Sequence, residues 1–396
     1  MYPDLSYILH ALLGTPPDNA LSIVKTFGLF LIISFLASAW FLRLELKRKE
    51  QEGLLTASKE KIIIGKPATT MQIVLNAVLG FVLGFKLVYI STHFAEFRED
   101  AAGVLLSGEG SVAAGIAGAI LLGFWKYWDS NKRRLDKPVT KVVSVLPHQR
   151  VGDITIVAAV SGVIGAKLAT IFESGDLFNR FLADPVNFLL SGSGLAIYGG
   201  LIVAFVTVLW YIRKKGIAPL HMMDAVAPAL MVGYGVGRIG CQLSGDGDWG
   251  VVNTAPTPSW WFLPDSWWAF DYPHNVLNNL REENMMLIES CDWDYCVKMI
   301  EPVFPTPIYE TIMAFIIVGI LWALRKRIKV PGALFFIYVL FTAVERYFIE
   351  KIRVNPPIEF LGMEGSQAEY ISVLLFIVGV GGLYWVWRRY RQPAPG

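Results

Sequence analysis

One long apolar segment of the chain ends in an arginine and two aspartates. Residues 231–250 read MVGYGVGRIGCQLSGDGDWG, with Arg238 inside the apolar part and Asp246 and Asp248 just beyond it. An arginine binds phosphate through two parallel hydrogen bonds. Glycines let backbone amides approach a ligand, or let two helices pack closely. Together these residues predict a binding site for an anionic group at the end of an apolar helix.

A second set of charges lies in the segment ERYFIEKIR, residues 345–353. Arg346 and Glu350 are four residues apart and share one face of a helix, and Arg353 follows one turn later. A paired arginine and glutamate costs less to bury than either alone, and the additional arginine leaves positive charge to hold an anion. Ionisable groups inside a membrane mark functional sites by default. A purely structural ion pair between helices is the alternative.

These segments belong to a chain that is too apolar for a soluble domain. Of its 396 residues, 54% are hydrophobic and 17% are charged, and its mean hydropathy is +0.48. Its net charge of +2 gives no general attraction to nucleic acid. We expect an all-α polytopic membrane protein of about nine transmembrane helices, because the apolar runs are long and lack strict alternation. The runs lie near residues 21–42, 72–91, 111–128, 152–173, 194–212, 221–240, 306–324, 332–350 and 370–387.

The loops between the apolar runs differ in their charge. Lysine and arginine cluster in alternate loops and at the C-terminus, as in RLELKRKE, NKRRLDK and RKRIK, whereas loops such as GDGDWG hold few of them. The positive-inside rule therefore predicts an outer N-terminus and a cytoplasmic C-terminus. Lys86 and Lys167 lie inside apolar runs. Each is interpreted either as a lysine that extends to the membrane surface or as part of a site.

Two stretches of the chain resemble each other. GFVLGFKLVYI (80–90) is similar to SGVIGAKLATI (161–171), and LLSGEGSVAAG (105–115) is similar to LLSGSGLAIYG (189–199). The two pairs predict a duplicated helical hairpin. Convergence of two spans rich in small residues is the alternative.

A long loop, residues 251–303, follows the first charged segment on the predicted outer side. It contains SWWFLPDSWWAFDYPH, and tryptophan pairs are typical of the lipid–water boundary. We expect this loop to form a small cap on the outer leaflet beside Arg238. Cys291 and Cys296 would face an oxidising compartment, which predicts a local disulfide; two free thiols are the alternative.

The segment DAVAPALMVGYGVGRIGCQLSGDGDWG (224–250) resembles the signature of the prolipoprotein diacylglyceryl transferase family. The matching residues are Asp224, Pro228, Arg238, Gly240 and Gly250, with Asp246 in place of a family glutamate. PTPIYE (305–310) resembles the family's Pro-x-Gln-Leu-Tyr-Glu, and RYFIEKIR resembles its Arg-Phe-x-x-Glu-x-x-Arg. SGSGLAIYGGL is similar to a glycine-rich family segment that ends in His-Gly-Gly.

The resemblance implies transfer of a diacylglyceryl group from phosphatidylglycerol to the lipobox cysteine of prolipoproteins. It implies the bacterial inner membrane, a site toward the periplasm, and phosphatidylglycerol, prolipoprotein signal peptides and the lipid bilayer as partners. The sequence itself shows no cluster of metal ligands and no nucleotide-binding loop, so we expect no metal, no cofactor and no nucleic acid. The residues carried over as catalytic are Arg238, Arg346, Tyr198, Asp246 and Glu350. Those expected to bind substrate are Gly199, Gly200, Gly240, Asp248, Trp249, Gly250, Tyr309, Glu310, Arg353 and Lys167.

Three residues depart from the family motifs. Tyr198 stands where the family has a histidine, Cys241 where it has an asparagine, and Pro307 where it has a glutamine. The family histidine has been proposed as the base that activates the thiol, whereas a tyrosine hydroxyl titrates only near about 10. We therefore expect Tyr198 to position the substrate while another outer-side group takes the proton. The candidates are Asp246, Asp248, His93 and His274.

We expect four parts along the chain. Residues 1–150 would hold the first helix and the added hairpin, 151–250 the catalytic core, 251–303 the outer cap, and 304–396 the helices that complete the site. Two other functions stay open. One is a related membrane transferase with another acceptor, and the other is a lipid-binding or transport protein on the same scaffold.

Overall fold

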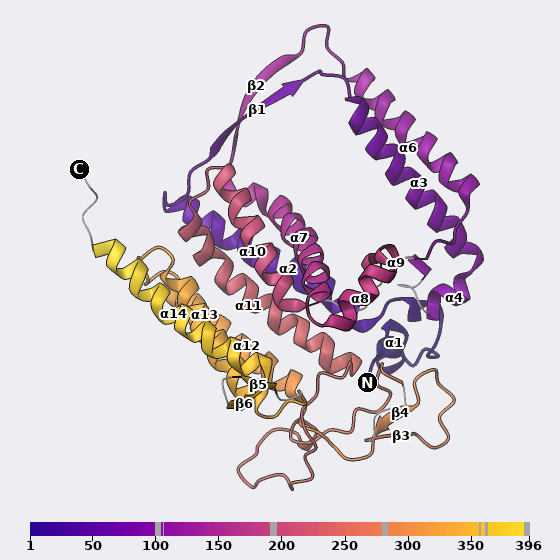
Figure 1. The fold of residues 1–396 in the computed structure, drawn as a ribbon, viewed down its shortest axis with the longest axis vertical. Helices are drawn as coiled ribbons and strands as arrows, with labels where there is room; N and C mark the ends of the chain where they lie inside the picture. Colours follow the sequence, from indigo (N-terminus) through magenta and orange to yellow (C-terminus); the bar gives the residue numbers. More distant parts are fainter. Residues whose placement is uncertain are drawn as a thin grey trace. The chain divides into compact units, whose positions relative to one another are not determined.

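The computed structural model describes residues 1–99, 104–105, 107–190, 196–278, 284–355, 358–360 and 363–391. The chain forms two compact units (Figure 1). The first unit consists of Met1–Thr56 and Ile217–Gly396, and the second unit is Ala57–Gly216. The first long helix belongs to the first unit because it packs with a helix of the C-terminal part, and the four parts expected along the chain stay a prediction.

The first unit is a bundle around α11, the helix that carries Arg238. Its helices are α1 (Leu5–Leu13), η1 (Ala20–Ile23), α2 (Thr26–Gln51), α11 (Pro219–Ser244), η3 (Asp265–Trp267), α12 (Thr306–Leu324), α13 (Ala333–Glu350) and α14 (Gln367–Arg391). α11 packs against α2, α12 and α13, and α14 packs on α13. The buried side chains of Met231, Ala314, Leu321 and Leu334 form the apolar core between α11, α12 and α13. This packing brings the end of α11 next to the beginning of α12.

The second unit consists of two helical hairpins joined by a β-ribbon. Its helices are α3 (Thr70–Thr92), α4 (Phe94–Glu99), α6 (Val112–Lys132), η2 (Pro147–Arg150), α7 (Val151–Ile171), α8 (Gly175–Ala183), α9 (Pro185–Leu190) and α10 (Ile197–Lys214). α3 pairs with α6, and α7 pairs with α10. Strands β1 (Ser58–Ile64) and β2 (Val139–Val145) run antiparallel, with Ser58 opposite Val145 and Ile64 opposite Val139.

The two hairpins share one arrangement around a buried lysine. In the first hairpin, the ammonium of Lys86 donates hydrogen bonds to the carbonyl oxygens of Ser107 at 2.6 Å and Glu109 at 2.9 Å. In the second, the ammonium of Lys167 donates to the carbonyl oxygen of Phe188 at 3.2 Å. Both lysines are only 8% exposed. Each ammonium binds the backbone that returns between the two helices, and this contact supports a structural role for both lysines.

The two hairpins also share a backbone hydrogen bond to the residue that precedes each lysine. The N–H of Ser111 donates to the carbonyl of Phe85 at 3.0 Å, and the N–H of Ala196 donates to the carbonyl of Ala166 at 3.2 Å. In each hairpin this bond ties the start of the second helix to the first. The shared pattern supports the duplication seen in the sequence, although residues 191–195 of the second copy lie outside the described residues.

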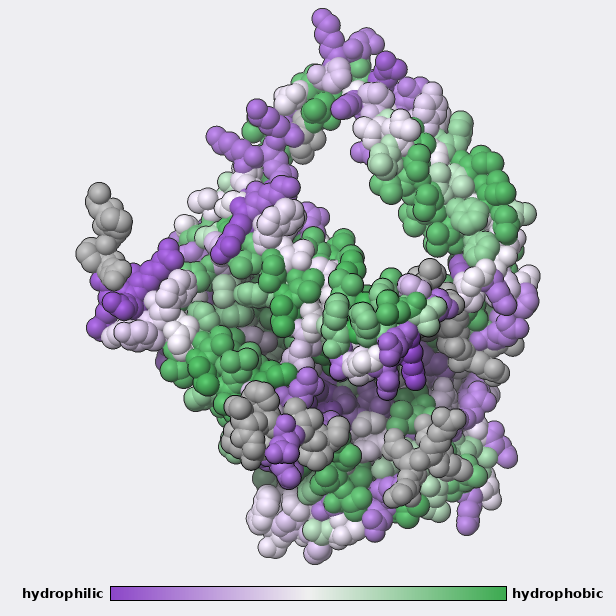
Figure 2. Space-filling model, viewed as in Figure 1, coloured by the Kyte–Doolittle hydropathy of each residue, from purple (hydrophilic) through white to green (hydrophobic). Residues whose placement is uncertain are grey.

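Each predicted transmembrane segment corresponds to a helix, and six of these helices are long and apolar enough to cross a membrane. They are Thr26–Gln51, Thr70–Thr92, Pro147–Ile171, Ile197–Lys214, Thr306–Leu324 and Gln367–Arg391. Apolar side chains cover long stretches of the helices, as expected of surfaces that face lipid (Figure 2). The chain is a mostly helical, multi-pass membrane protein. α6, α11 and α13 lie at predicted positions but fall outside this set, so a total of nine spans stays a prediction.

The expectation of an all-α fold needs one correction, because the described residues include three two-stranded antiparallel sheets. Besides β1 and β2, strand β3 (Met285–Leu287) pairs with β4 (Val297–Met299), and β5 (Ile358–Phe360) pairs with β6 (Met363–Gly365). All three sheets lie outside the long helices. Their strands are too short or too weakly alternating to stand out in the sequence, and local pairing satisfies their backbone groups.

Residues 251–303 fold into a compact cap with its own apolar core. Its buried side chains, together with Trp249, are Tyr272, Met285, Val297, Met299 and Val303. Cys291 and Cys296 form a disulfide, with 5.7 Å between their Cα atoms, so this prediction is confirmed. The N-terminal segment joins the cap: the ring of Tyr7 packs on Trp293 at 5.4 Å. Residues 279–283 of the loop lie outside the described residues.

Candidate active site

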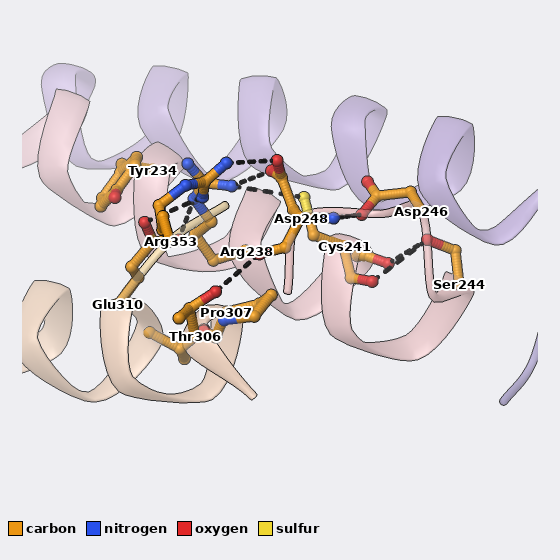
Figure 3. A network of polar contacts seen from close by, with 12 residues as sticks. Tyr234, Arg238, Cys241, Ser244, Asp246, Asp248, Thr306, Pro307, Glu310 and Arg353 are labelled. Carbon is orange, nitrogen blue, oxygen red and sulfur yellow. Dashed lines mark hydrogen bonds and ion pairs between the residues drawn. The ribbon is translucent and has the colours of Figure 1, made fainter. Parts of the chain in front are cut away.

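Glu310 is the centre of a buried cluster of charges in the first unit (Figure 3). It lies just after the first turn of α12, and its side chain is fully buried. Arg238 Nε lies 2.6 Å from Glu310 Oε2, and Nη1 of both Arg346 and Arg353 lies 3.4 Å from Oε1. One carboxylate thus orients three guanidinium groups that come from α11, from α13 and from the residues just after α13.

Asp248 is a second carboxylate that bridges two of these arginines. It forms an ion pair with Nη1 of Arg238, and its Oδ1 lies 2.6 Å from Nη2 of Arg353. Burial favours the neutral form of Asp248, but the two guanidinium groups outweigh it and hold the pKa of this carboxyl below its usual value. The side chain of Asp248 is 33% exposed, whereas that of Glu310 is 0% exposed. Asp248 is therefore the carboxylate that faces the open side of the cluster.

Glu350 balances the third arginine. Its Oε2 lies 2.8 Å from Nη2 of Arg346, and its Oε1 accepts a hydrogen bond from Nδ2 of Asn355 at 2.5 Å. Three carboxylates therefore face three guanidinium groups. The sequence led us to expect a surplus of positive charge around the arginines. That expectation is wrong, because Asp248 and Glu310 also pair with the arginines.

Backbone contacts at Gly250 hold the loop after α11 against two other segments. The N–H of Gly250 donates to the carbonyl of Phe304 at 2.8 Å, and the N–H of Val251 donates to the carbonyl of Ile352 at 2.8 Å. A Cβ atom at Gly250 would lie 2.4 Å from the Ile352 carbonyl oxygen, so only glycine permits this approach. Thr306 Oγ1 adds a hydrogen bond to the carbonyl of Asp248 at 2.6 Å. The backbone thereby fixes Asp248 beside Arg353.

Asp246 and Cys241 lie next to the arginine cluster. The thiol of Cys241 and carboxylate oxygens of Asp246 and Asp248 all lie within 4.8 Å of one another. Burial, followed by the charge of Asp248, raises the pKa of Asp246 above the ordinary value. This donor set does not fit a metal ion, because Asp248 is already bonded to the positive groups of Arg238 and Arg353. Asp246 instead has the properties of a carboxylate that can accept a proton.

Several predicted substrate-binding residues make contacts within the protein. The ring of Trp249 packs on Tyr272 at 4.9 Å inside the cap core. The hydroxyl of Tyr309 donates to the carbonyl of Trp267 at 2.7 Å. A Cβ atom at Gly240 would lie 2.6 Å from the Cβ of Phe30, so Gly240 lets α2 and α11 pack closely. These contacts position the cap and the helices around the charged cluster.

Four predicted site residues lie in the second unit. Tyr198 is half-buried in the first turn of α10, directly before Gly199 and Gly200. A Cβ atom at Gly199 would lie 2.0 Å from Ala169 Cβ, and one at Gly200 would lie 2.8 Å from a carbonyl oxygen of α7. Both glycines therefore let α7 and α10 pack closely. Lys167 binds backbone in the same hairpin.

Sequence reasoning missed two residues that support Arg238. The ring of Tyr234 lies 5.2 Å from the Arg238 guanidinium carbon, and its hydroxyl donates to Glu345 Oε1 at 3.1 Å. Glu345 is only 5% exposed. The spacing of four residues between Tyr234 and Arg238 could have predicted the first contact. The spacing of residues could not predict the contact between Tyr234 and Glu345, because they lie on different helices.

The fold and the site define a multi-pass membrane protein with a buried arginine–carboxylate cluster where its helices end. The family model for prolipoprotein diacylglyceryl transferase matches residues 113–385. The chain belongs to this family, and the resemblance seen in its motifs is confirmed.

Curated relatives carry the name phosphatidylglycerol–prolipoprotein diacylglyceryl transferase. The chain is 25% identical over 282 residues to the protein of Staphylococcus carnosus. The aligned region covers 71% of this chain and 86% of that protein. It is 30% identical over 234 residues to the protein of Bifidobacterium adolescentis. Here the aligned region covers 58% of this chain and 63% of that protein. The relatives are transferases, and the family implies lipid and prolipoprotein substrates.

Proposed function

We propose that this protein transfers the diacylglyceryl group of phosphatidylglycerol to the lipobox cysteine of prolipoproteins, with its site on the outer side of the bacterial cytoplasmic membrane. The observation that carries the proposal is the cluster around Glu310. Arg238, Arg346 and Arg353 come from two separate family motifs, and all three meet one buried carboxylate. Family membership supplies the reaction class.

In the proposed reaction, the thiol sulfur attacks the terminal glycerol carbon of the diacylglyceryl group. A carbon–sulfur bond forms, the bond from that carbon to the phosphate oxygen breaks, and glycerol phosphate leaves with the electron pair. The thiol proton passes to a base. The arginines would bind the phosphate and stabilise the charge that develops on the leaving oxygen. Asp248 is the partner that the phosphate would replace, because it is partly exposed, while buried Glu310 keeps the guanidinium groups in place.

We propose that Asp246 is the base that accepts the thiol proton. This role predicts a pH dependence. Because burial and Asp248 raise the pKa of Asp246, the carboxylate should become protonated at a higher pH than an ordinary aspartate does. kcat/KM should therefore fall as the pH decreases through this raised pKa and stay level above it. Asp246→Asn should remove the acid limb and lower kcat about 100-fold. A pH profile of the variant that keeps the acid limb would contradict the assignment.

Tyr198→Phe tests the alternative base. In our proposal Asp246 accepts the proton and the Tyr198 hydroxyl only positions the substrate. Removal of this hydroxyl should therefore lower kcat/KM less than about 10-fold. Initial rates with phosphatidylglycerol vesicles and a lipobox peptide measure the effect. Near-complete loss in Tyr198→Phe, with activity restored in Tyr198→His, would instead make residue 198 the direct base.

The decisive test of the function uses purified protein, phosphatidylglycerol and a lipobox peptide, followed by mass spectrometry. We expect the peptide to gain the mass of one diacylglyceryl group and glycerol phosphate to appear in equal amount. A peptide with serine in place of the lipobox cysteine is the matched control and should stay unmodified. Lack of any lipid turnover would contradict the proposal.

A related transferase with another acceptor is the second candidate. Tyr198 and Cys241 favour it, because both replace residues of the family motif. In the same assay, release of glycerol phosphate without modification of the peptide would select this candidate.

A further inference from the structure

The cap carries a short aromatic loop, residues 259–268, which we call the tryptophan finger. Its sequence is SWWFLPDSWW, and its single charged residue, Asp265, comes after the tip. The rings of Trp260, Trp261 and Trp268 pack on one another with centroid distances of 5.3 to 6.1 Å. The finger is therefore a formed element that holds its tip in place.

The tip of the finger is exposed and apolar. Phe262 is 89% exposed, and Trp260 is 67% exposed. The neighbouring indoles are held at the base of the tip: Nε1 of Trp261 donates to the Pro264 carbonyl at 3.2 Å, and Nε1 of Trp268 donates to the Ala255 carbonyl at 3.0 Å. Large aromatic side chains presented side by side on a rigid loop mark an interaction surface.

The base of the finger is attached to a helix that can cross the membrane. The hydroxyl of Tyr309, in the first turn of α12, donates to the carbonyl of Trp267 at 2.7 Å. Asn253 Nδ2 donates to the carbonyl of Trp268 at 2.7 Å. α12 is apolar enough to cross a bilayer, and it begins at Thr306. The base of the finger is thus attached to the end at which this apolar helix begins.

We propose that Trp260 and Phe262 insert into the lipid interface at the membrane face where α11 ends and α12 begins. Tryptophan and phenylalanine side chains favour this layer, and the tip carries no charge that would oppose insertion. The lipid surface is the occupant that the attachment to α12 favours. The inserted finger fastens the cap to the bilayer beside Tyr309, the residue that precedes Glu310.

Insertion is tested with a fluorescent label at Phe262→Cys, in vesicles of phosphatidylglycerol and phosphatidylethanolamine. Bromine atoms near the top of the acyl chains quench only labels that reach the lipid. We expect a shift of the emission to shorter wavelength, loss of fluorescence with brominated lipid, and protection from aqueous iodide. Leu287→Cys is the matched control, because Leu287 is also an exposed apolar cap residue, at 57%, and lies on β3 outside the finger. Its label should respond to iodide and not to bromine.

Three results would overturn the proposal. A label at residue 262 that iodide quenches would place the tip in water. A label shielded from both quenchers would place it against protein, such as a second copy of the chain. Equal quenching by bromine at residues 262 and 287 would show that the whole cap, rather than the finger, rests on the lipid. The measurement requires no catalysis, so it separates this proposal from the proposed transfer reaction.

Discussion

Arg238→Lys should insert and fold normally and lose about 100- to 1,000-fold of its kcat, the usual loss when one preorganised donor to a developing oxyanion is removed. Arg238 directs Nε to Glu310 and Nη1 to Asp248, so its planar fork contacts two carboxylates at once. A lysine ammonium keeps the charge but cannot reproduce this geometry. Arg346→Lys should behave similarly, because Arg346 spans Glu310 and Glu350. The rate of glycerol phosphate release, measured at saturating phosphatidylglycerol, gives the effect.

Arg325→Lys is the matched control for this experiment. Arg325 belongs to the same unit and is 13% exposed, close to the 15% of Arg238. It also pairs with a fully buried carboxylate, Glu45, at 2.8 Å, but it follows the opposite end of α12. Its replacement should leave kcat nearly unchanged. Normal turnover in both Arg238→Lys and Arg346→Lys would remove these arginines from the mechanism.

Glu310→Gln should cause the largest loss of stability among single changes at the site. The substitution keeps the shape of the side chain but leaves three guanidinium groups around a neutral amide. Removing one partner of a buried ion pair typically costs about 3–5 kcal/mol, because the remaining charge is buried without compensation. The thermal unfolding midpoint in detergent should fall clearly, and activity should be lost with it.

A second substitution separates charge imbalance from a simple packing defect. Glu310→Gln combined with Arg353→Gln removes one positive charge together with the negative one, so the unfolding midpoint should partly recover. Glu289→Gln, at an exposed position of the cap, should change the free energy of unfolding by less than about 0.5 kcal/mol. A double variant less stable than Glu310→Gln alone would contradict the view that Glu310 acts by neutralising the arginines.

The sequence by itself determined the features that depend on neighbouring residues. Runs of apolar residues marked the positions of the long helices, because a membrane requires a continuous apolar segment of about 20 residues. The spacing of Arg346, Glu350 and Arg353 correctly predicted the contact between the first two. The pair Cys291 and Cys296 predicted a bridge that closes a short local loop.

Only the tertiary structure decided which charges meet. Asp248 and Glu310 lie on different segments, and the packing of α11 against α12 and α13 brings both to the arginines. The hydrogen bonds of Lys86 could not be predicted from the sequence either. Its partners are backbone carbonyl groups of the loop between two helices, and every residue type has such a group. Hydropathy and helical spacing are properties of a short stretch of chain, whereas an ion pair between helices depends on the crossing of elements far apart in sequence. For that reason the arginines and the carboxylates could be named from the sequence, while the contacts of Glu310 with all three arginines and of Asp248 with Arg353 required the fold.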